Sequence, residues 1–349
     1  MRKLASVQVI QNITPIDGAD KIELTHIGGW KVVVAKNVGH KIGDKVVYCE
    51  IDSFLPIEPE FEFLRKSSYK KLVDGTEGFR LKTIRLRGQI SQGLIIPIGS
   101  AIDIIKRNRG EVYCEMIEEG KDLTDLLGIT KYEPPIPANL AGKVKGNFPS
   151  FISKTDEERC QNLTAELEQW SEESDKHQFY VTEKLDGSSF TCYFKDGEFG
   201  VCSRNLELQR DKNNTFWKTA IDLQLEEKLR FYGKNLALQG ELIGEGVQKN
   251  RYKIKGHTIR FFNVFDIQEH QKVDYDTFHT IIQDLDLQTV PITEVPGFNL
   301  PNNTDKLLNL AEGKSVLNNK AEREGIVIRS KDNTISFKAI SNKFLVKNE

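Results

Sequence analysis

The first part of the chain alternates apolar and polar residues in short runs, which predicts a series of β-strands. IELTHIG and WKVVVAKN meet at Gly28-Gly29, a favourable hairpin signal, and KVVYCEI follows the turn residues Gly43-Asp44. About five such strands with glycine-rich turns predict a small Greek-key barrel of the OB-fold type over residues 1–130. Barrels of this kind often bind nucleic acid.

A later run of this region, GFRLKTIRLRGQISQGLIIPI, combines strand-like alternation with positive charge. Arg80 and Lys82 alternate with apolar residues, and so do Arg85 and Arg87, but the parity shifts between the two pairs. The shift predicts a β-bulge, and one face of the strand would be strongly basic. We expect this face to bind nucleic acid, although a solvated charged face is the alternative.

A change of composition marks a break between two domains. KYEPPIPANLAGKVKGNFPS contains four prolines, which prevent a continuous helix or strand, so we interpret residues 131–150 as an interdomain linker. Directly after it, residues 155–158 form a T-x-x-E capping box. This pattern predicts a helix that carries Arg159 and Gln161 and opens the second domain.

From residue 178 onward, strand-like segments recur between two helix-like stretches near residues 214–230 and 303–318. The strand-like segments are FYVTEKL, SFTCYF, GVCSRN, ALQGELIG, IRFFNVFDI, GIVIRS and TISFKAI. This mixture predicts an α+β domain over residues 151–349, built from mainly antiparallel sheets with helices.

Composition fits a globular protein of two domains. The 349 residues are 38% hydrophobic and 29% charged, and no apolar run approaches the length of a membrane span. The N-terminal residues lack the apolar core of a signal peptide, so we expect a soluble, cytoplasmic protein with no membrane partner, acting as a monomer.

Charge and cysteine usage narrow the function further. The net charge of −2 argues against a protein that coats nucleic acid non-specifically. The five cysteines lack the spacing of zinc or redox motifs, so we interpret them as reduced core thiols.

The most informative short motif is KLDG, in which Lys184 is followed by Asp186 and Gly187. Alone it is a weak signal, since a solvated lysine in a turn after a strand gives the same pattern. Its context strengthens it, because Lys184 follows the alternating run FYVTE and precedes a glycine-serine turn. The amine would therefore stand at a strand end, where a buried nucleophile can meet a ligand phosphate.

From this motif onward the chain resembles the covalent nucleotidyltransferase superfamily, which contains DNA ligases, RNA ligases and mRNA capping enzymes. The motifs appear in the family's order: KLDG with Lys184, CSRN with Arg204, LQGELIG with Glu241, FFNVFDI with Phe265, REGIVIR with Glu324, and ISFKAIS with Lys338. The resemblance implies a nucleotidyltransferase domain, similar to ATP-grasp-like ligases, in which Lys184 becomes covalently linked to AMP from ATP.

The residue types fit that chemistry. A lysine amine must lose its proton before it attacks phosphorus, yet its ordinary pKa is about 10.4, so a neighbouring cation has to favour the neutral form. Lys338 and a magnesium ion are the candidates. Asp186, Glu241 and Glu324 would supply three carboxylates from separate strand ends, which can hold the metal through its water ligands.

The resemblance also implies roles in nucleotide binding. Glu241 would contact the ribose of AMP, Arg204 the ribose or a phosphate, and Phe265 would stack on adenine, with Phe261 and Phe262 as competitors. The adenine edge would be read by Glu183 or Thr182. Gly187, Gln161 and Lys338 are the further expected nucleotide contacts, and Arg159 is expected to assist catalysis.

Domain order indicates the branch of the superfamily. DNA ligases and capping enzymes carry an OB-fold after the fifth motif, whereas here the barrel comes first and the chain ends eleven residues beyond Lys338. This order is similar to that of the Naegleria-type RNA ligases, which include a Deinococcus enzyme. GADKIE, IDSFLP, RGQISQGL, TDEERCQN and SFKAISN agree with that group, and GELIGEGVQKN is similar to RNA-editing-type ligases.

The resemblance implies an RNA ligase that acts in RNA repair on nicked duplex RNA or an RNA-containing duplex. With magnesium or manganese, AMP would pass from Lys184 to an RNA 5′-phosphate, and an RNA 3′-hydroxyl would then displace it. The chain departs from the family's fifth motif at one position, because many relatives carry a second basic residue where this chain has Ile340. Either Lys343 would substitute for that residue or Lys338 would serve alone. Sealing of DNA nicks, or RNA binding by a decayed, non-catalytic domain, are the alternatives.

Overall fold

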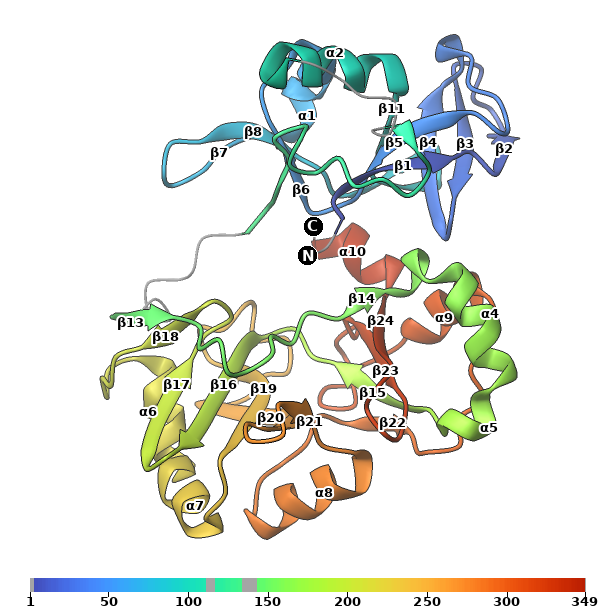
Figure 1. Ribbon diagram of the computed structural model, residues 1–349. Helices are drawn as coiled ribbons and strands as arrows, with labels where there is room; N and C mark the ends of the chain where they lie inside the picture. Colours follow the sequence, from blue (N-terminus) through green and yellow to red (C-terminus); the bar gives the residue numbers. More distant parts are fainter. Residues whose placement is uncertain (1–2, 111–116, 134–142, 349) are drawn as a thin grey trace. The chain divides into compact units, whose positions relative to one another are not determined.

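The chain is described by a computed structural model over residues 3–110, 117–133 and 143–348 (Figure 1). It divides into two compact units. Unit 1 contains Met1–Pro135 together with Gln161–Leu163 and Leu345–Glu349, and unit 2 contains Ile136–Cys160 and Thr164–Phe344. Two short segments that follow residue 160 therefore belong to unit 1.

Unit 1 consists of short antiparallel strands arranged in four small sheets. Their orders are β1-β5-β11, β2-β3-β4, β12-β6-β8-β7 and β10-β9. The strands are β1 (Ala5–Val9), β2 (Asn12–Pro15), β3 (Ile22–Ile27), β4 (Trp30–Ala35), β5 (Lys45–Cys49), β6 (Ser53–Leu55), β7 (Tyr69–Lys71), β8 (Glu77–Arg80), β9 (Thr83–Leu86), β10 (Gln89–Gln92), β11 (Leu94–Pro97) and β12 (Thr130–Lys131).

Helices complete the core of unit 1. They are η1 (Lys36–Val38), η2 (Pro59–Leu64), α1 (Arg65–Ser68) and α2 (Ile98–Arg109). The apolar side of α2, with Ile104 and Ile105, packs with Val7, Val47 and Phe79 from three strands into one buried cluster. The predicted hairpin is confirmed, because Ile27 pairs with Trp30 across the two glycines.

The predicted basic strand is wrong, because the run GFRLKTIRL forms two strands that belong to different sheets. β8 ends at Arg80 and β9 begins at Thr83, so the shift of parity marks the break between them and not a bulge within one strand. Arg80 lies with its guanidinium 4.3 Å from the ring centre of Tyr132. Arg85 is exposed on β9 and Arg87 lies in the turn that follows, with a φ of 49°, so the four basic residues share no single strand face.

Unit 2 is built on two sheets, here called the large sheet and the small sheet. The seven-stranded large sheet has the order β13 (Val144–Asn147), β18 (Leu206–Leu208), β17 (Glu198–Cys202), β16 (Ser188–Lys195), β19 (Leu236–Gly244), β20 (His257–Asp266) and β21 (Gln271–Lys272). The five-stranded small sheet has the order β14 (Glu158–Arg159), β24 (Ser336–Ile340), β23 (Gly325–Arg329), β15 (Tyr180–Lys184) and β22 (Ile292–Glu294). Pairing is antiparallel except between β14 and β24.

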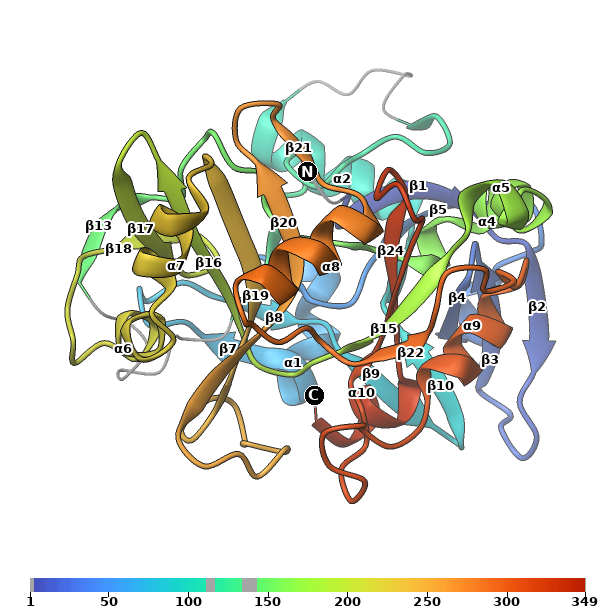
Figure 2. The ribbon, with the colours of Figure 1, turned by 90° about the horizontal axis from the view of Figure 1, so that it is seen from below.

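Three helices cover one face of the large sheet: α6 (Thr215–Asp222), α7 (Leu225–Tyr232) and α8 (Tyr275–Asp284) (Figure 2). The Asn214 side chain accepts hydrogen bonds from the backbone N–H groups of Phe216 and Trp217, which starts α6 at Thr215. The opposite face of the large sheet carries an apolar cluster with Tyr193, Ala237 and Phe265 and, further along β19, the polar side chains of Gln239 and Glu241.

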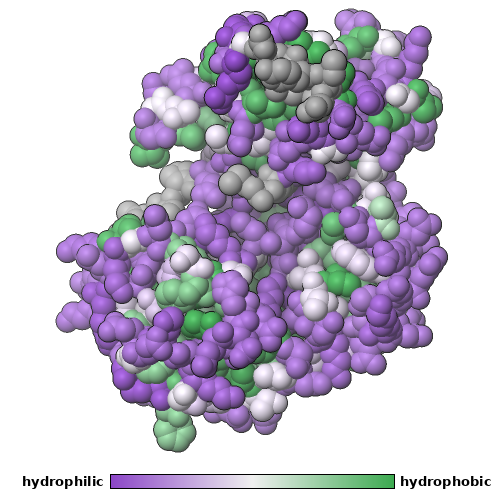
Figure 3. All heavy atoms as spheres, viewed as in Figure 1, coloured by the Kyte–Doolittle hydropathy of each residue, from purple (hydrophilic) through white to green (hydrophobic). Residues whose placement is uncertain are grey.

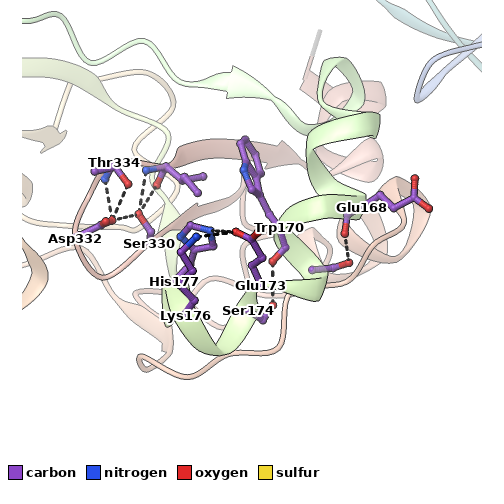
Figure 4. A network of polar contacts seen from close by, with 11 residues as sticks. Glu168, Trp170, Glu173, Ser174, Lys176, His177, Ser330, Asp332 and Thr334 are labelled. Carbon is purple, nitrogen blue, oxygen red and sulfur yellow. Dashed lines mark hydrogen bonds and ion pairs between the residues drawn. The ribbon is translucent and has the colours of Figure 1, made fainter.

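The small sheet is accompanied by α4 (Thr164–Glu172), α5 (Ser174–His177) and α9 (Thr304–Ala311), with η4 (Cys160–Asn162) before α4 and α10 (Asn342–Asn348) after β24. Trp170 of α4 stacks on Phe337 of β24, with ring centres 5.7 Å apart. Polar contacts at the ends of α4 and α5 and in the turn after β23 add to this packing (Figure 4).

The structure corrects the elements expected around the linker and the helices. The helix predicted from the capping box is wrong: the segment forms β14 and η4, and α4 begins only at Thr164. The reason is tertiary, because β14 pairs with β24 and the Glu158 carboxylate accepts the N–H of Arg159. The stretch 214–230 divides into α6 and α7, only Thr304–Ala311 of 303–318 is helical, and α8 was not predicted.

The interior and surface agree with the expectations drawn from composition. Four cysteines (Cys49, Cys160, Cys192 and Cys202) are buried free thiols, which confirms their assignment, and Cys114 lies outside the described residues. The face drawn in Figure 3 is mainly hydrophilic, with apolar residues in small separate areas. Among the described residues, no helix has the length and apolar character needed to cross a membrane.

Candidate active site

Lys184 stands at the end of β15, where the small sheet brings it beside Glu324. Lys184 pairs with Gly325 on β23, and Glu324 directly precedes that residue. The Lys184 Nζ lies 2.8 Å from Oε1 of Glu324. A Cβ at Gly325 would lie 2.2 Å from the carbonyl oxygen of Ala339, so only glycine fits at this position.

The glycine of KLDG lets the lysine loop pass directly against the large sheet. A Cβ at Gly187 would lie 2.4 Å from the carbonyl oxygen of Leu242 and 2.8 Å from Cγ of Glu241. The close approach brings Glu241, in the middle of β19 and not at a strand end, to the lysine. Lys184, Glu241 and Glu324, predicted from motifs far apart in sequence, therefore meet at one place.

Electrostatics at this place is dominated by negative charge. Burial lowers the pKa of Lys184, but Glu324, Glu241 and Asp186 raise it by more, so the net shift is upward. Burial raises the pKa of Glu241 to about 8, against the influence of Lys184. Burial also raises the pKa of Glu324, although Lys184 and Lys338 oppose that shift. Without substrate, Lys184 is therefore held as an ammonium ion, contrary to the expectation that its neighbours favour the neutral form.

The carboxylates fit a hydrated metal ion better than a directly ligated one. Within the described ranges, no three side chains of His, Cys, Asp or Glu are arranged to hold a metal ion. Asp186, Glu241 and Glu324 nevertheless lie close enough to act together on Lys184. Magnesium and manganese retain water ligands readily, so carboxylates that hold those waters suit this arrangement.

Lys338 and Arg159 lie on paired strands of the small sheet. Arg159 of β14 is the register partner of Lys338 on β24, and Lys338 in turn faces Val327 on β23. Lys338 contributes to the pKa of Glu324, which couples it to the Lys184 group. The structure thus brings together these residues from the predicted set.

Ile340 and Lys343 are the two positions that bear on a second basic residue in the fifth motif. Ile340 pairs with Gly325, on the strand face that Lys184 and Lys338 share, and it is 3% exposed. Lys343 places its Nζ 2.6 Å from Oε2 of Glu312. Neither position presents an uncommitted cation beside Lys184.

Two residues were alternatives for the adenine edge, and their surroundings differ. The Thr182 hydroxyl donates to the Val327 carbonyl at 3.4 Å and accepts from Arg329 at 3.2 Å. Glu183 is 1% exposed; its Oε2 accepts from the Val316 backbone at 2.8 Å, whereas its Oε1 has no hydrogen-bond partner among the described residues. Burial raises the pKa of Glu183. Glu183 therefore retains an acceptor for a ligand.

The assignment of the aromatic platform to Phe265 is wrong. Phe265 is 1% exposed and packs against Phe151 and Ile152 of the segment before β14, so no ring face is open to a base. Phe262 is the extra residue of a β-bulge between β19 and β20, where Gln239 pairs with Asn263 but Gly240 pairs with Phe261. The bulge aims Phe262 at the group around Leu185.

Arg204 and Gln161, two further expected nucleotide contacts, have different surroundings. Arg204 is exposed after β17 and forms an ion pair with Asp156. Gln161 is 2% exposed, belongs to unit 1, and accepts a hydrogen bond from Gly29 through its carbonyl at 3.0 Å.

Sequence reasoning missed residues that hold the lysine loop. The Tyr252 hydroxyl accepts the N–H of Asp186 at 2.6 Å, Gln248 donates to the Gly187 carbonyl at 3.0 Å, and Arg251 pairs with the Asp186 carboxylate. All three come from the segment QKNRY after β19, whose clustering of polar residues beside the third motif was the available signal.

Comparisons with known proteins were made on both sequence and structure. A family model described as RNA ligase matches residues 177–347, and one described as an OB-fold domain matches residues 4–98. The comparison with curated proteins returned no match.

Solved structures match along nearly the whole chain. Naegleria gruberi RNA ligase with pyrophosphate is 41% identical over 100% of this chain and 99% of that chain, with a TM-score of 0.89. Single-residue variants of that ligase, one with ATP and manganese and one with AMP and manganese, are 41% identical over 99% of this chain and 98% of theirs, with TM-scores of 0.87 and 0.88. The predicted OB-fold followed by an α+β nucleotidyltransferase domain is confirmed, and the chain belongs to the RNA ligase family represented by the Naegleria gruberi enzyme.

Proposed function

We propose that this protein is an ATP-dependent RNA ligase that seals nicked duplexes through a covalent lysyl-AMP on Lys184. The observation that carries the proposal is the meeting of Lys184 with Glu324 and Glu241, made possible by the close approach at Gly187. The ligands of the related structures, ATP, AMP and pyrophosphate, are the reactants and products of such a step.

In the first step, the Lys184 Nζ attacks the α-phosphorus of ATP and forms a P–N bond. The P–O bond to the β-phosphate breaks, pyrophosphate leaves, and the amine loses its proton. Alignment of the attacking and leaving groups supplies much of the rate in such transfers. The hydrogen bond to Glu324 holds the lysine in a defined direction before ATP arrives.

The carboxylates explain why a divalent cation belongs to this site. Asp186, Glu241 and Glu324 would hold hydrated magnesium or manganese, whose charge offsets the negative field that now raises the pKa of Lys184 and neutralises phosphate oxygens. With that field offset, the Lys184 ammonium releases its proton more readily. Lys338 and Arg159 are positioned on adjacent strands to neutralise further phosphate charge.

Two residues are suited to recognise adenine: Glu183, which has a free acceptor oxygen within the described part of the chain, and Phe262, which has an aromatic ring for stacking. Oε1 of Glu183 would accept a hydrogen bond from the adenine 6-amino group, and the ring of Phe262 would stack on the base. Guanine presents a carbonyl oxygen at the same position, which a carboxylate repels. ATP is therefore favoured over GTP.

The later steps join the RNA ends. An oxygen of the RNA 5′-phosphate attacks the AMP phosphorus, the P–N bond breaks, and Lys184 regains its amine. A 3′-hydroxyl then attacks the activated 5′-phosphate and AMP leaves. We assign the 3′-hydroxyl to an RNA strand, expect a monomer acting inside the cell in RNA repair, and assign duplex contacts to Lys82, Arg85 and Arg87 of unit 1, with Arg80 as an indirect support.

The deciding experiment is incubation with α-labelled ATP or GTP and magnesium or manganese. Wild-type protein should acquire a covalent AMP label with ATP and much less label with GTP. Lys184→Ala should acquire none, whereas the exposed helical lysine variant Lys218→Ala should label normally. Unlabelled wild-type protein would refute the proposal.

A second assay tests the strand assignment. Nicked duplexes that differ only in ribose or deoxyribose at the 3′-hydroxyl end are compared for sealing. Faster sealing of the ribose-terminated nick is expected, and equal sealing of an all-DNA nick would overturn the RNA assignment while leaving the lysyl-AMP chemistry intact.

A further inference from the structure

Arg251 occupies an unusual position beside the lysine loop. It lies in the segment between β19 and β20, and its Nε donates to the Asp186 carboxylate, two residues from Lys184. The side chain is 17% exposed, and its guanidinium carbon lies 4.7 Å from the ring centre of Phe344. One side of the guanidinium is thus anchored by a carboxylate and its plane is supported by an aromatic ring.

The other side of the same guanidinium is open. Among the described residues, the Nη1 and Nη2 atoms of Arg251 make no hydrogen bond, since its side chain is engaged only through Nε and the Phe344 ring. The backbone is held as well, because the Asn318 side chain donates to the Arg251 carbonyl at 2.7 Å. A fixed guanidinium with free donors is well suited to bind an anion bidentately.

The neighbours of the Arg251 guanidinium indicate which anion it would bind. Asp186 is close enough to Lys184 to raise its pKa, so the arginine bound to Asp186 borders the place where Lys184 meets phosphorus. The strand face beside Lys184 carries the buried, apolar Ile340 two residues after Lys338, which leaves phosphate oxygens without a second cation from β24. Arg251 approaches from the large-sheet side instead.

We propose that Arg251 binds a phosphate group adjoining the reacting phosphorus and supplies the cation that β24 does not. The inference rests on the proposed function of Lys184. Two phosphates share this chemistry: the β- or γ-phosphate of ATP in the first step, and the 5′-phosphate of the RNA end in the second. The interaction with Asp186 orients the guanidinium toward either one.

The test compares Arg251→Gln with Lys249→Gln, which removes the same charge from an exposed position of the same loop. Binding of ATP and of AMP is measured by calorimetry in the Lys184→Met background, where no adduct forms. If the phosphate belongs to ATP, Arg251→Gln weakens ATP binding about 10- to 100-fold, the range of a charge-assisted hydrogen bond, and leaves AMP binding unchanged.

The RNA arm uses wild-type Lys184 loaded with AMP and a 5′-phosphorylated nick in single turnover. If ATP and AMP binding are unchanged and AMP transfer to the nick slows by a similar factor, the phosphate belongs to the RNA end. Arg251→Lys should recover part of the lost function in whichever arm responds, because it keeps the charge but not the fork.

Two outcomes overturn the inference. The first is no change in either arm. The second is an equal loss of ATP and AMP binding together with a lower melting temperature, which would mean that Arg251 only braces the lysine loop. Failure of the proposed function is distinguishable from both, because wild-type protein would then form no lysyl-AMP at all.

Discussion

Two groups of charged side chains lie along the small sheet, one at Lys184 and one near Thr182 on the same strand, β15. The two groups differ in their balance of positive and negative charge. At Lys184, one amine faces Glu324 at 2.8 Å and lies under the influence of two further carboxylates. Near Thr182, Arg329 is 4% exposed and places its Nη2 3.2 Å from Oε1 of Glu157. Lys272 and Lys338 also act on the Glu157 carboxylate. The first group carries an excess of negative charge and the second does not.

The difference is visible in the pKa values and suggests how the two groups are used. At the Lys184 group, burial raises the pKa of Glu241 to about 8. Burial would likewise raise the pKa of Glu157, but Arg329, Lys272, the Ser336 hydroxyl and Lys338 together lower it by more, so the net shift is downward. A group with excess carboxylate gains from an added cation, whereas the Glu157 carboxylate is already stabilised by Arg329, Lys272 and Lys338. We therefore expect the first group to serve the proposed chemistry and the second to stabilise the small sheet.

The largest effect on stability is expected from breaking the ion pair between Arg329 and Glu157. Glu157→Gln leaves the buried Arg329 charge without its anion, which should lower the free energy of unfolding by about 3–5 kcal/mol, measured by urea denaturation. Because the folded pKa of Glu157 is lowered, its contribution is present at neutral pH and is lost as pH falls through that pKa. The stability gap between variant and wild type should therefore narrow in acid.

The matched control is Glu173→Gln, which removes an exposed carboxylate that pairs with Lys176 and His177 at the ends of α4 and α5 (Figure 4). It should cost clearly less stability than Glu157→Gln, since solvent screens the pair. Under native conditions Glu157→Gln should still form lysyl-AMP. A variant that is stable but unable to form the adduct would place Glu157 in the reactive group and erase the distinction.

A second prediction concerns Phe262, whose ring lies beside Arg329. The Arg329 guanidinium carbon lies 5.5 Å from the Phe262 ring centre. Phe262→Ala should weaken ATP binding by about 1–3 kcal/mol, the range of base–aromatic stacking, as measured by calorimetry in the Lys184→Met background. Phe265→Leu should leave ATP binding unchanged, because that ring is buried under Phe151 and Ile152. The opposite pattern would restore Phe265 as the platform.

A third prediction tests the unbalanced group through stability and pH, in buffer with a chelator. The folded pKa of Glu241, about 8, is above its ordinary value, so its contribution to stability is full below the ordinary pKa and is lost as pH rises through 8. Glu241→Gln removes that dependence. From pH 5 to pH 9, the melting temperature of wild type should fall relative to the variant by roughly 2–6 °C. Parallel melting profiles would show that Glu241 ionises normally.

The residues that sequence reasoning placed correctly are those fixed by motif and strand register together. Lys184, Glu241 and Glu324 each lie beside a glycine at which a Cβ would clash with a neighbouring strand. The glycine in the sequence therefore marks the close approach of the two chain segments. The hairpin of β3 and β4 was predictable for a similar reason, since the two glycines that form its turn lie between the strands they join.

The residues that were misplaced depend on contacts that no local pattern records. Phe265 is buried and Phe262 lies beside Leu185 because a bulge opposite Gln239 shifts parity and a distant segment covers Phe265. Arg159 lies in a strand and not a helix because β14 pairs with β24, which is far along the sequence. A period of two or of 3.6 residues cannot reveal either event.

The smallest effect is expected in unit 1, where the basic residues also differ in their surroundings. Arg80 lies over the ring of Tyr132, whereas Arg85 and Arg87 are exposed at the turn between β9 and β10. Each phosphate contact adds about one to the slope of log affinity against log salt, so Arg85→Glu and Arg87→Glu should each weaken binding of nicked RNA and reduce that slope by at least about one. Lys106→Glu, an exposed residue of α2, controls for overall charge. Lysyl-AMP formation should be normal in all of these variants. The contrary result would be that Arg80→Glu weakens RNA binding as much as Arg85→Glu without loss of stability. A charge held over an aromatic ring would then still be available to RNA, and the expected difference between Arg80 and Arg85 would not exist.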